Sequence, residues 1–269
     1  MRRPRLMTCA ALCALAWTAL PVAAAEEPAA GTAEPAGQGQ ARIHKIGPHL
    51  YQIGAVVLDA ESRTARCPGR VNMNEGGPIE LLACLPRGKT HESVFTLEVE
   101  PTDLQVALLL LGMCDGRNPA VKCPEGSPDL QRPPGDEAVI SVEWRGPAEG
   151  SGQDPPVNKR RAEDFLVNVK AEGPAPAATW VFLGSRIVDG KFGADQDGSL
   201  ITTFHDPLAI LELALPTVND DVYYFVNKDV CPPVGTPVEL VVQAPPKKTD
   251  TSDEPKKGAS EGGEAQKTG

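Results

Sequence analysis

The residues best suited to chemistry gather in the segment GKTHES, Gly88–Ser93, which places a lysine, a histidine, a glutamate and a serine within five positions. Histidine and serine are the side chains that hydrolases pair as general base and nucleophile. A second histidine, His205, is followed directly by Asp206. A hydrolase or a metal-assisted enzyme would therefore use His91, Ser93, His205 and Asp206, with His91 taking its partner from a distant strand.

The local pattern around His91 favours a structural role over that chemistry. The segment from His91 to Val99 alternates like a strand, so His91 and Ser93 are expected on one face and Glu92 on the other. Neighbouring His and Glu side chains on opposite faces cannot act as base and orienting group. We therefore expect His91 to be a buried, hydrogen-bonded structural residue, and whether the protein is an enzyme stays open.

Three nucleotide- or metal-site patterns fit poorly. The stretch ACLPRGKT resembles a phosphate loop but lacks its first glycine and carries Pro86 where a backbone amide is needed. A zinc protease would need a second histidine four positions after His91, and none occurs there. The stretch ADQDGSLIT lacks the first ligand and the final glutamate of a calcium loop. The sequence therefore specifies no metal site and no cofactor.

Five cysteines lie beyond the N-terminal apolar stretch, without a CxxC pair. Cys114 and Cys123 flank a Pro-rich stretch and are the natural candidates for a disulfide in an oxidising compartment. Cys84 lies in an apolar run and is expected to be a buried thiol. Cys67, Cys123 and Cys231 each precede proline, so a redox or haem accessory that uses a cysteine thiolate remains a weaker alternative.

The ends of the chain indicate export. Residues 1–25 combine three arginines, an apolar stretch and the small residues Ala23-Ala24-Ala25, which is the pattern of a signal peptide. Residues 26–42 form a predicted disordered linker and residues 244–269 a predicted disordered charged tail, because neither contains enough apolar surface to fold. The predicted location is outside the cytoplasm, either periplasmic or secreted.

Charge limits the partners that the chain can bind. The formal net charge is −10, and removal of the three N-terminal arginines would make it more negative. No basic stripe interleaved with aromatic residues occurs, so we expect no binding to nucleic acid. The partner is unknown from sequence, and another envelope protein is one possibility.

Residues 43–243 are expected to form one domain. Nine short alternating or β-rich stretches predict strands: Leu50–Leu58, Ile79–Leu85, His91–Val99, Val139–Trp144, Phe165–Val169, Thr179–Gly184, Ser199–Phe204, Val222–Val226 and Val238–Val242. We expect long irregular connections at 113–137 and 146–160. The prediction is an α+β fold, mainly antiparallel β-sheet with one buried capped helix and one short second helix.

The main helix is predicted between Pro101 and Gly112. Thr102 and Gln105 have the spacing of a capping box, and Gly112 stands where a left-handed residue ends helices. Apolar residues occur on every side, so the helix is expected to be buried nearly all round. The short second helix is predicted over Leu208–Leu215, after Asp206-Pro207.

These segments resemble the YdjY-like domain family of exported bacterial proteins. The resemblance rests on GPIELLACLPRGKTHESVFTLEVEPTDLQVALLLLG, then TWVFLGSRI and VCPPVGTPVEL, in that order. It implies that Gly88, Lys89, His91, Glu92 and Ser93 belong to the hallmark segment of the family, with no established reaction or ligand. Together with the local pattern, it leads us to expect a non-catalytic binding or assembly module of the cell envelope.

Overall fold

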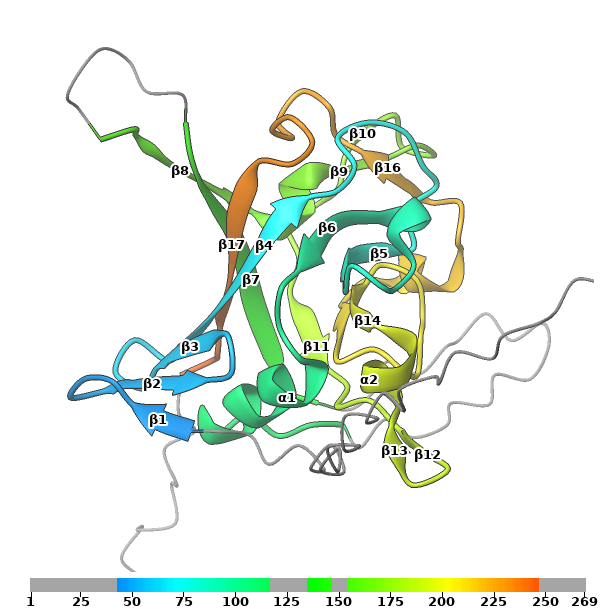
Figure 1. The fold of residues 1–269 in the computed structure, drawn as a ribbon. Coiled ribbons are helices and arrows are strands. Elements are labelled where there is room, and N and C mark those ends of the chain that lie inside the picture. Colours follow the sequence, from blue (N-terminus) through cyan, green and yellow to red (C-terminus); the bar gives the residue numbers. More distant parts are fainter. Residues whose placement is uncertain (1–42, 117–134, 147–153, 247–269) are drawn as a thin grey trace, which may run out of the picture. The chain divides into compact units, whose positions relative to one another are not determined.

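The computed structural model describes residues 43–116, 135–146 and 154–246 (Figure 1). The predicted signal peptide, and nearly all of the predicted linker and tail, lie outside these residues. None of the helices in the described ranges is long and apolar enough to cross a membrane.

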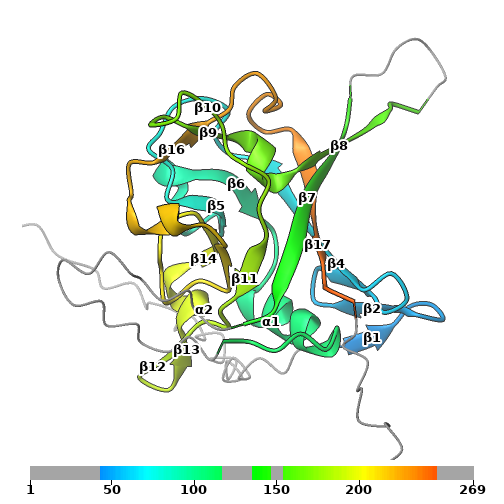
Figure 2. The ribbon, with the colours of Figure 1, turned by 180° about the vertical axis from the view of Figure 1, so that it is seen from behind.

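Eight strands form a closed barrel, which Figures 1 and 2 show from opposite sides. Around the barrel, each strand pairs with the next and the last pairs with the first: β4 (Thr64–Val71), β17 (Pro237–Gln243), β7 (Glu137–Arg145), β11 (Trp180–Phe182), β15 (Leu211–Leu213), β14 (Ser199–Thr202), β5 (Leu81–Cys84) and β6 (Ser93–Leu97). The predicted α+β class is therefore wrong, because most of the regular structure is strand and the sheet closes on itself. Closure removes the exposed edges that these eight strands would have in an open sheet.

The sheet is mixed rather than purely antiparallel. β5 pairs with β6 in parallel, and β14 pairs with β15 in parallel, whereas the other six barrel pairings are antiparallel. Parallel neighbours need a connection that returns the chain to the starting end of the strand, usually over a dozen residues or more. Here the two connections are Leu85–Glu92, which we term the first crossover, and Thr203–Ile210, the second crossover. The sequence-predicted site residues lie on or beside these two short connections.

Aliphatic and aromatic side chains fill the barrel. Alternation along the three long strands directs every second residue inward, as in the register-matched row Cys67, Leu240 and Val142, and all three are fully buried or nearly so. Phe95 and Phe165 meet edge to face, with ring centroids 5.1 Å apart.

Smaller elements surround the barrel. An antiparallel extension of the sheet, β1 (Ile43–Lys45), β2 (Leu50–Ile53) and β3 (Val56–Asp59), joins at β4, and β8 (Val157–Arg161) pairs with β7. Two separate small sheets follow: β10 (Gly173–Pro174), β9 (Leu166–Asn168) and β16 (Tyr224–Val226), and β12 (Ile187–Val188) with β13 (Lys191–Phe192). Three 3-10 turns are η1 (Thr90–Glu92), η2 (Ala162–Phe165) and η3 (Pro216–Asn219).

The main helix, α1 (Pro101–Leu110), lies at one end of the barrel in Figures 1 and 2. Leu104, Ala107 and Leu108 are fully buried, but Leu109 and Leu110 are 45% and 54% exposed, so the prediction of burial on every side is wrong. Gly112 has a φ of +76°, which confirms the predicted left-handed end.

The predicted capping box is also wrong. The helix begins at Pro101 and Glu100 is the residue that precedes it, so Thr102 already lies within the first turn. Its backbone N–H and hydroxyl both donate to Asp195, at 3.1 and 2.6 Å. The helix start is thus stabilised by a carboxylate from α2 (Gly193–Asp197), where negative charge is favoured.

The second helix is not where the sequence predicts it. Residues 208–210 complete the second crossover and 211–213 form strand β15, whereas the short second helix is α2. Leu211 and Leu213 point into the core and Glu212 points away from it, which is the two-residue period of a strand. Gly198, with a φ of +82°, then ends α2 in the left-handed conformation.

Candidate functional site

The first crossover is held by side chains that bind its backbone. Ser93 is fully buried and its hydroxyl donates to the carbonyl of Lys89 at 2.8 Å. From β4's end, the amide of Asn72 donates to the carbonyls of Thr90 and Ser93 at 2.6 and 2.7 Å. These bonds supply hydrogen-bond partners to three backbone carbonyls where the turn passes into strand β6. The Ser93 hydroxyl thus binds the turn that precedes its own strand.

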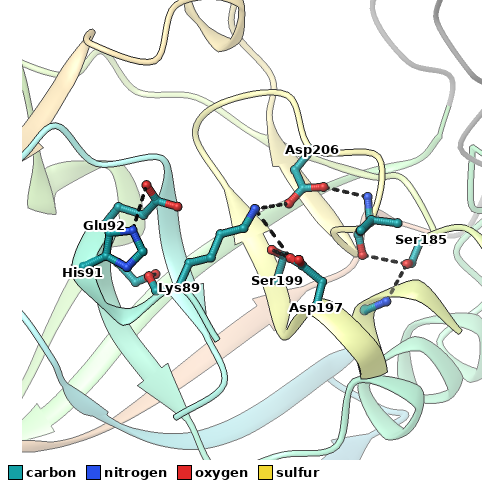
Figure 3. Close-up of polar contacts among 10 residues, drawn as sticks. Lys89, His91, Glu92, Ser185, Asp197, Ser199 and Asp206 are labelled. Atoms are coloured by element: carbon teal, nitrogen blue, oxygen red, sulfur yellow. Dashed lines mark hydrogen bonds and ion pairs between the residues drawn. The ribbon is translucent and has the colours of Figure 1, made fainter. Parts of the chain in front are cut away.

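Lys89 joins the two crossovers, as Figure 3 shows. Its ammonium lies 3.2 Å from Asp206 of the second crossover and 3.6 Å from Asp197 at the end of α2. Burial alone would lower the pKa of Lys89, but the two aspartates outweigh it and the net shift is upward. Lys89 is therefore charged and paired with two aspartates, and these ion pairs connect the first crossover to the second crossover and to α2.

The second crossover is bound to its surroundings at several further points. Asp206 accepts a hydrogen bond from the backbone of Leu208 at 2.8 Å, and the Leu208 carbonyl accepts one from Ser185 at 2.6 Å. The same Ser185 hydroxyl receives the N–H of Ala194 from α2 (Figure 3). Asp197 also accepts a hydrogen bond from Ser199. Asp206 is thus one member of a continuous polar network.

His91 is exposed, contrary to the prediction of a buried structural residue. Its side chain is 79% accessible in η1, and its Nε2 lies 3.7 Å from Oε2 of the adjacent Glu92 (Figure 3). The prediction that His91 and Glu92 lie on opposite faces of a strand is also wrong, because residues 90–92 form a 3-10 turn and the strand begins only at Ser93. The long, exposed contact is worth little energetically.

His205 has a different partner from any that the sequence indicates. Its Nδ1 lies 2.6 Å from Oε2 of Glu212 on β15, and Glu212 is only 1% exposed. The hydrogen bond to Glu212 raises the pKa of His205, against the lowering effect of burial. The four predicted catalytic candidates thus have partners outside their own set: His91 contacts Glu92, Ser93 and Asp206 both bind Lys89, and His205 pairs with Glu212.

Among the described cysteines, burial raises the thiol pKa of three, and the fourth, Cys114, is exposed. Burial raises the thiol pKa of Cys67 and of Cys231 to about 12, and it also raises that of Cys84, which is fully buried as predicted. Thiols with such pKa values stay protonated and weakly nucleophilic near neutral pH. Cys114 is exposed and Cys123 lies outside the described residues, so the Cys114–Cys123 disulfide stays a prediction.

The outer wall of the barrel carries a groove of about 350 Å³. Its floor contains one row of register-matched residues across four strands, namely Arg66, Val241, Ser141 and Arg161. Eight of the ten lining residues are polar or charged: Asp59, Ser62, Thr64, Arg66, Ser141, Lys159, Arg161 and Gln243. Asp59 belongs to β3 and Lys159 to β8, the two outermost of the five strands that line the groove.

Ion pairs anchor Arg66, one of the two arginines in this row. Arg66 donates to Glu143 at 2.9 Å and also to Glu239, while Lys159 lies 2.9 Å from Glu143. Burial would raise the pKa of Glu143, but the two cations outweigh it and lower the pKa. These ion pairs fix the direction of the long side chains at the groove without leaving a net positive surface.

Sequence reasoning missed Asn72, Asp197, Glu212 and the groove. Glu212 carried one signal, because a lone acid between two leucines in an apolar run must find a partner if it is buried. The groove had none, since strand β17 reaches its place between β4 and β7 through pairings with residues far away in the sequence. In the described ranges, no three His, Cys, Asp or Glu side chains are grouped as a metal site.

Among the comparisons with known proteins, a family model gave a match. No curated protein and no solved structure matches the chain. The model of the YdjY domain matches residues 56–243, which include all eight barrel strands and both crossovers. The chain therefore belongs to the YdjY domain family.

Proposed function

We propose that the protein is an exported, non-catalytic binding module of the cell envelope, and that the groove on the outer barrel wall is its binding surface. The groove is the observation that carries this proposal, because it offers polar groups across five strands of rigid sheet. Export rests on the signal-peptide pattern of residues 1–25.

The contacts of the hallmark segment support binding over hydrolysis. A hydrolytic site needs a nucleophile and a base within hydrogen-bond reach of one another. Here the Ser93 hydroxyl is directed to the Lys89 carbonyl, and Asp206 is directed to the Lys89 ammonium. These groups maintain the two crossovers, which leaves the outer groove as the better candidate for recognition.

The lining chemistry indicates the ligand class. Hydroxyl groups and the Gln243 amide suit a ligand rich in hydroxyls and amides, and Asp59 suits an amine. Lys159 stays 61% exposed while paired with Glu143, so it can also donate to a ligand carboxylate. The groove contains no aromatic lining residue, so stacking on rings is not the mode of recognition. We infer a polar glycopeptide that carries both charge types.

Titration with soluble muropeptides tests this proposal, since these amino-sugar peptides contain hydroxyl, amide, amine and carboxylate groups. Nuclear magnetic resonance of the mature chain should show shifts at residues of the groove, and Ser141→Trp, which fills the floor, should abolish them. Lys191→Trp, a bulky change on the exposed β13, is the matched control and should leave binding unchanged. The absence of shifts, or equal loss in both variants, would remove the groove as the binding surface.

A further inference from the structure

The second crossover depends on one contact whose charge changes near neutral pH. Most of its other contacts are pH-insensitive in this range: Thr203 donates to the Ile79 carbonyl at 2.8 Å and the His205 backbone N–H donates to the Val218 carbonyl at 2.8 Å. The imidazole of His205 is the exception, because histidine is the side chain that ordinarily titrates between about pH 5 and 8.

The surroundings of the imidazole make its change of charge matter for stability. Its partner Glu212 is buried on β15, and a buried carboxylate is costly unless a cation or several donors accompany it. The charged groups that act on the imidazole come from three segments: Glu212 of β15, Asp206 of the crossover itself, and Arg186 from the loop before β12. The two acids favour the imidazolium, and Arg186 opposes it.

We propose that His205 and Glu212 form a pH-responsive latch that holds the second crossover, Thr203–Ile210, against the barrel wall and, through Asp206, holds Lys89 of the first crossover. Protonated His205 pairs with the buried carboxylate by both charge and hydrogen bond. Neutral His205 retains at most the hydrogen bond and leaves the charge of Glu212 without a counter-ion in a poorly hydrated site.

The direction of the His205 pKa shift determines whether the latch is closed at low or at high pH. The pKa of His205 is raised in the folded protein, so its contribution to stability is fully present below the unfolded pKa of about 6.5. That contribution is lost as the pH rises through the folded value. The latch is therefore closed in mildly acidic solution and loosens in alkaline solution.

Hydrogen exchange of the full chain, with rates divided by the intrinsic rate at each pH, tests the latch. We expect protection of the His205 and Ala209 amides to fall several-fold between about pH 6 and about pH 9. The amide of Leu240 lies on barrel strand β17, between β4 and β7, and should keep its protection. This comparison separates local opening from global unfolding. A parallel fall at Leu240, or no fall at the crossover, would overturn the proposal.

Two variants and a control identify the groups. Glu212→Gln removes the counter-charge, so it should lower crossover protection at acidic pH and abolish the pH response. His205→Asn keeps a donor near the Nδ1 position, should likewise remove the pH response, and serves if the first variant does not fold. His91→Asn, at an exposed histidine, should keep the response of the wild type. A pH response that persists in either latch variant would contradict the assignment.

Discussion

Asn72 shows how one side chain can fix the hallmark segment from outside it. Its amide donates to the carbonyls at both ends of the η1–β6 junction, Thr90 and Ser93, while the Ser93 hydroxyl holds Lys89. The result is a tight corner in which three backbone carbonyls have side-chain donors and the histidine faces solvent. In the hallmark segment, a serine of the kind that hydrolases use as a nucleophile instead fixes the backbone of the turn.

Exposure should decide thiol reactivity among the described cysteines. After reduction, Cys114 should react with iodoacetamide well before Cys67, Cys84 and Cys231, because it is exposed and burial raises the thiol pKa of the other three. Peptide mass mapping of the alkylated protein at neutral pH measures this order. Early modification of Cys84 or Cys231 would show that the barrel opens more readily than the structure implies.

At the scale of elements, helix α1 has one buried and one exposed face. Leu108→Ala removes a fully buried side chain and should lower the free energy of unfolding by about 2–5 kcal/mol. Leu110→Ala is the matched control two positions away and should change it by less than about 0.5 kcal/mol, since that side chain is 54% exposed. Urea denaturation of both variants measures the difference. Equal effects would mean that α1 packs by a different face.

The closing pair of the barrel, β4 and β6, depends on the absence of a side chain at Gly69. A Cβ there would overlap the carbonyl oxygen of Thr96 on the neighbouring strand, so Gly69→Ala should cost about 1–3 kcal/mol. Gly173→Ala, on the edge strand β10, meets only ordinary contacts and is the control. A stable Gly69→Ala variant, measured by thermal unfolding, would show that closure tolerates a wider spacing.

The strands that the sequence predicted are those with β-branched and aliphatic residues in alternation, and all nine predicted stretches contain strand in the structure. The sequence did not predict strand β4, because Pro68 and Gly69 are typical of a turn, or strand β8, because it is largely polar. It failed at β15 because Leu211 and Leu213 also fit a short helix after Asp206-Pro207. Local pattern therefore located strands well where composition was strongly β-like.

At the scale of the whole molecule, barrel closure was beyond local reasoning. The pairings β4–β17 and β11–β7 join residues far apart in sequence, and no alternation pattern specifies which strand lies beside which. The same limit applies to the site: Lys89 meets Asp206 because the two crossovers lie side by side, and His205 meets Glu212 because the second crossover leads into strand β15 rather than into a helix. The candidate residues were visible in sequence, but their partners depended on topology.

The hallmark segment builds a corner of the barrel. The free energies of unfolding of Ser93→Ala and His91→Ala test this role most directly. Ser93→Ala removes a buried hydrogen bond to Lys89 and should cost about 1–3 kcal/mol, whereas His91→Ala should change stability by less than about 0.5 kcal/mol. A neutral Ser93→Ala together with a destabilising His91→Ala, measured by urea denaturation under the same conditions, would contradict the account.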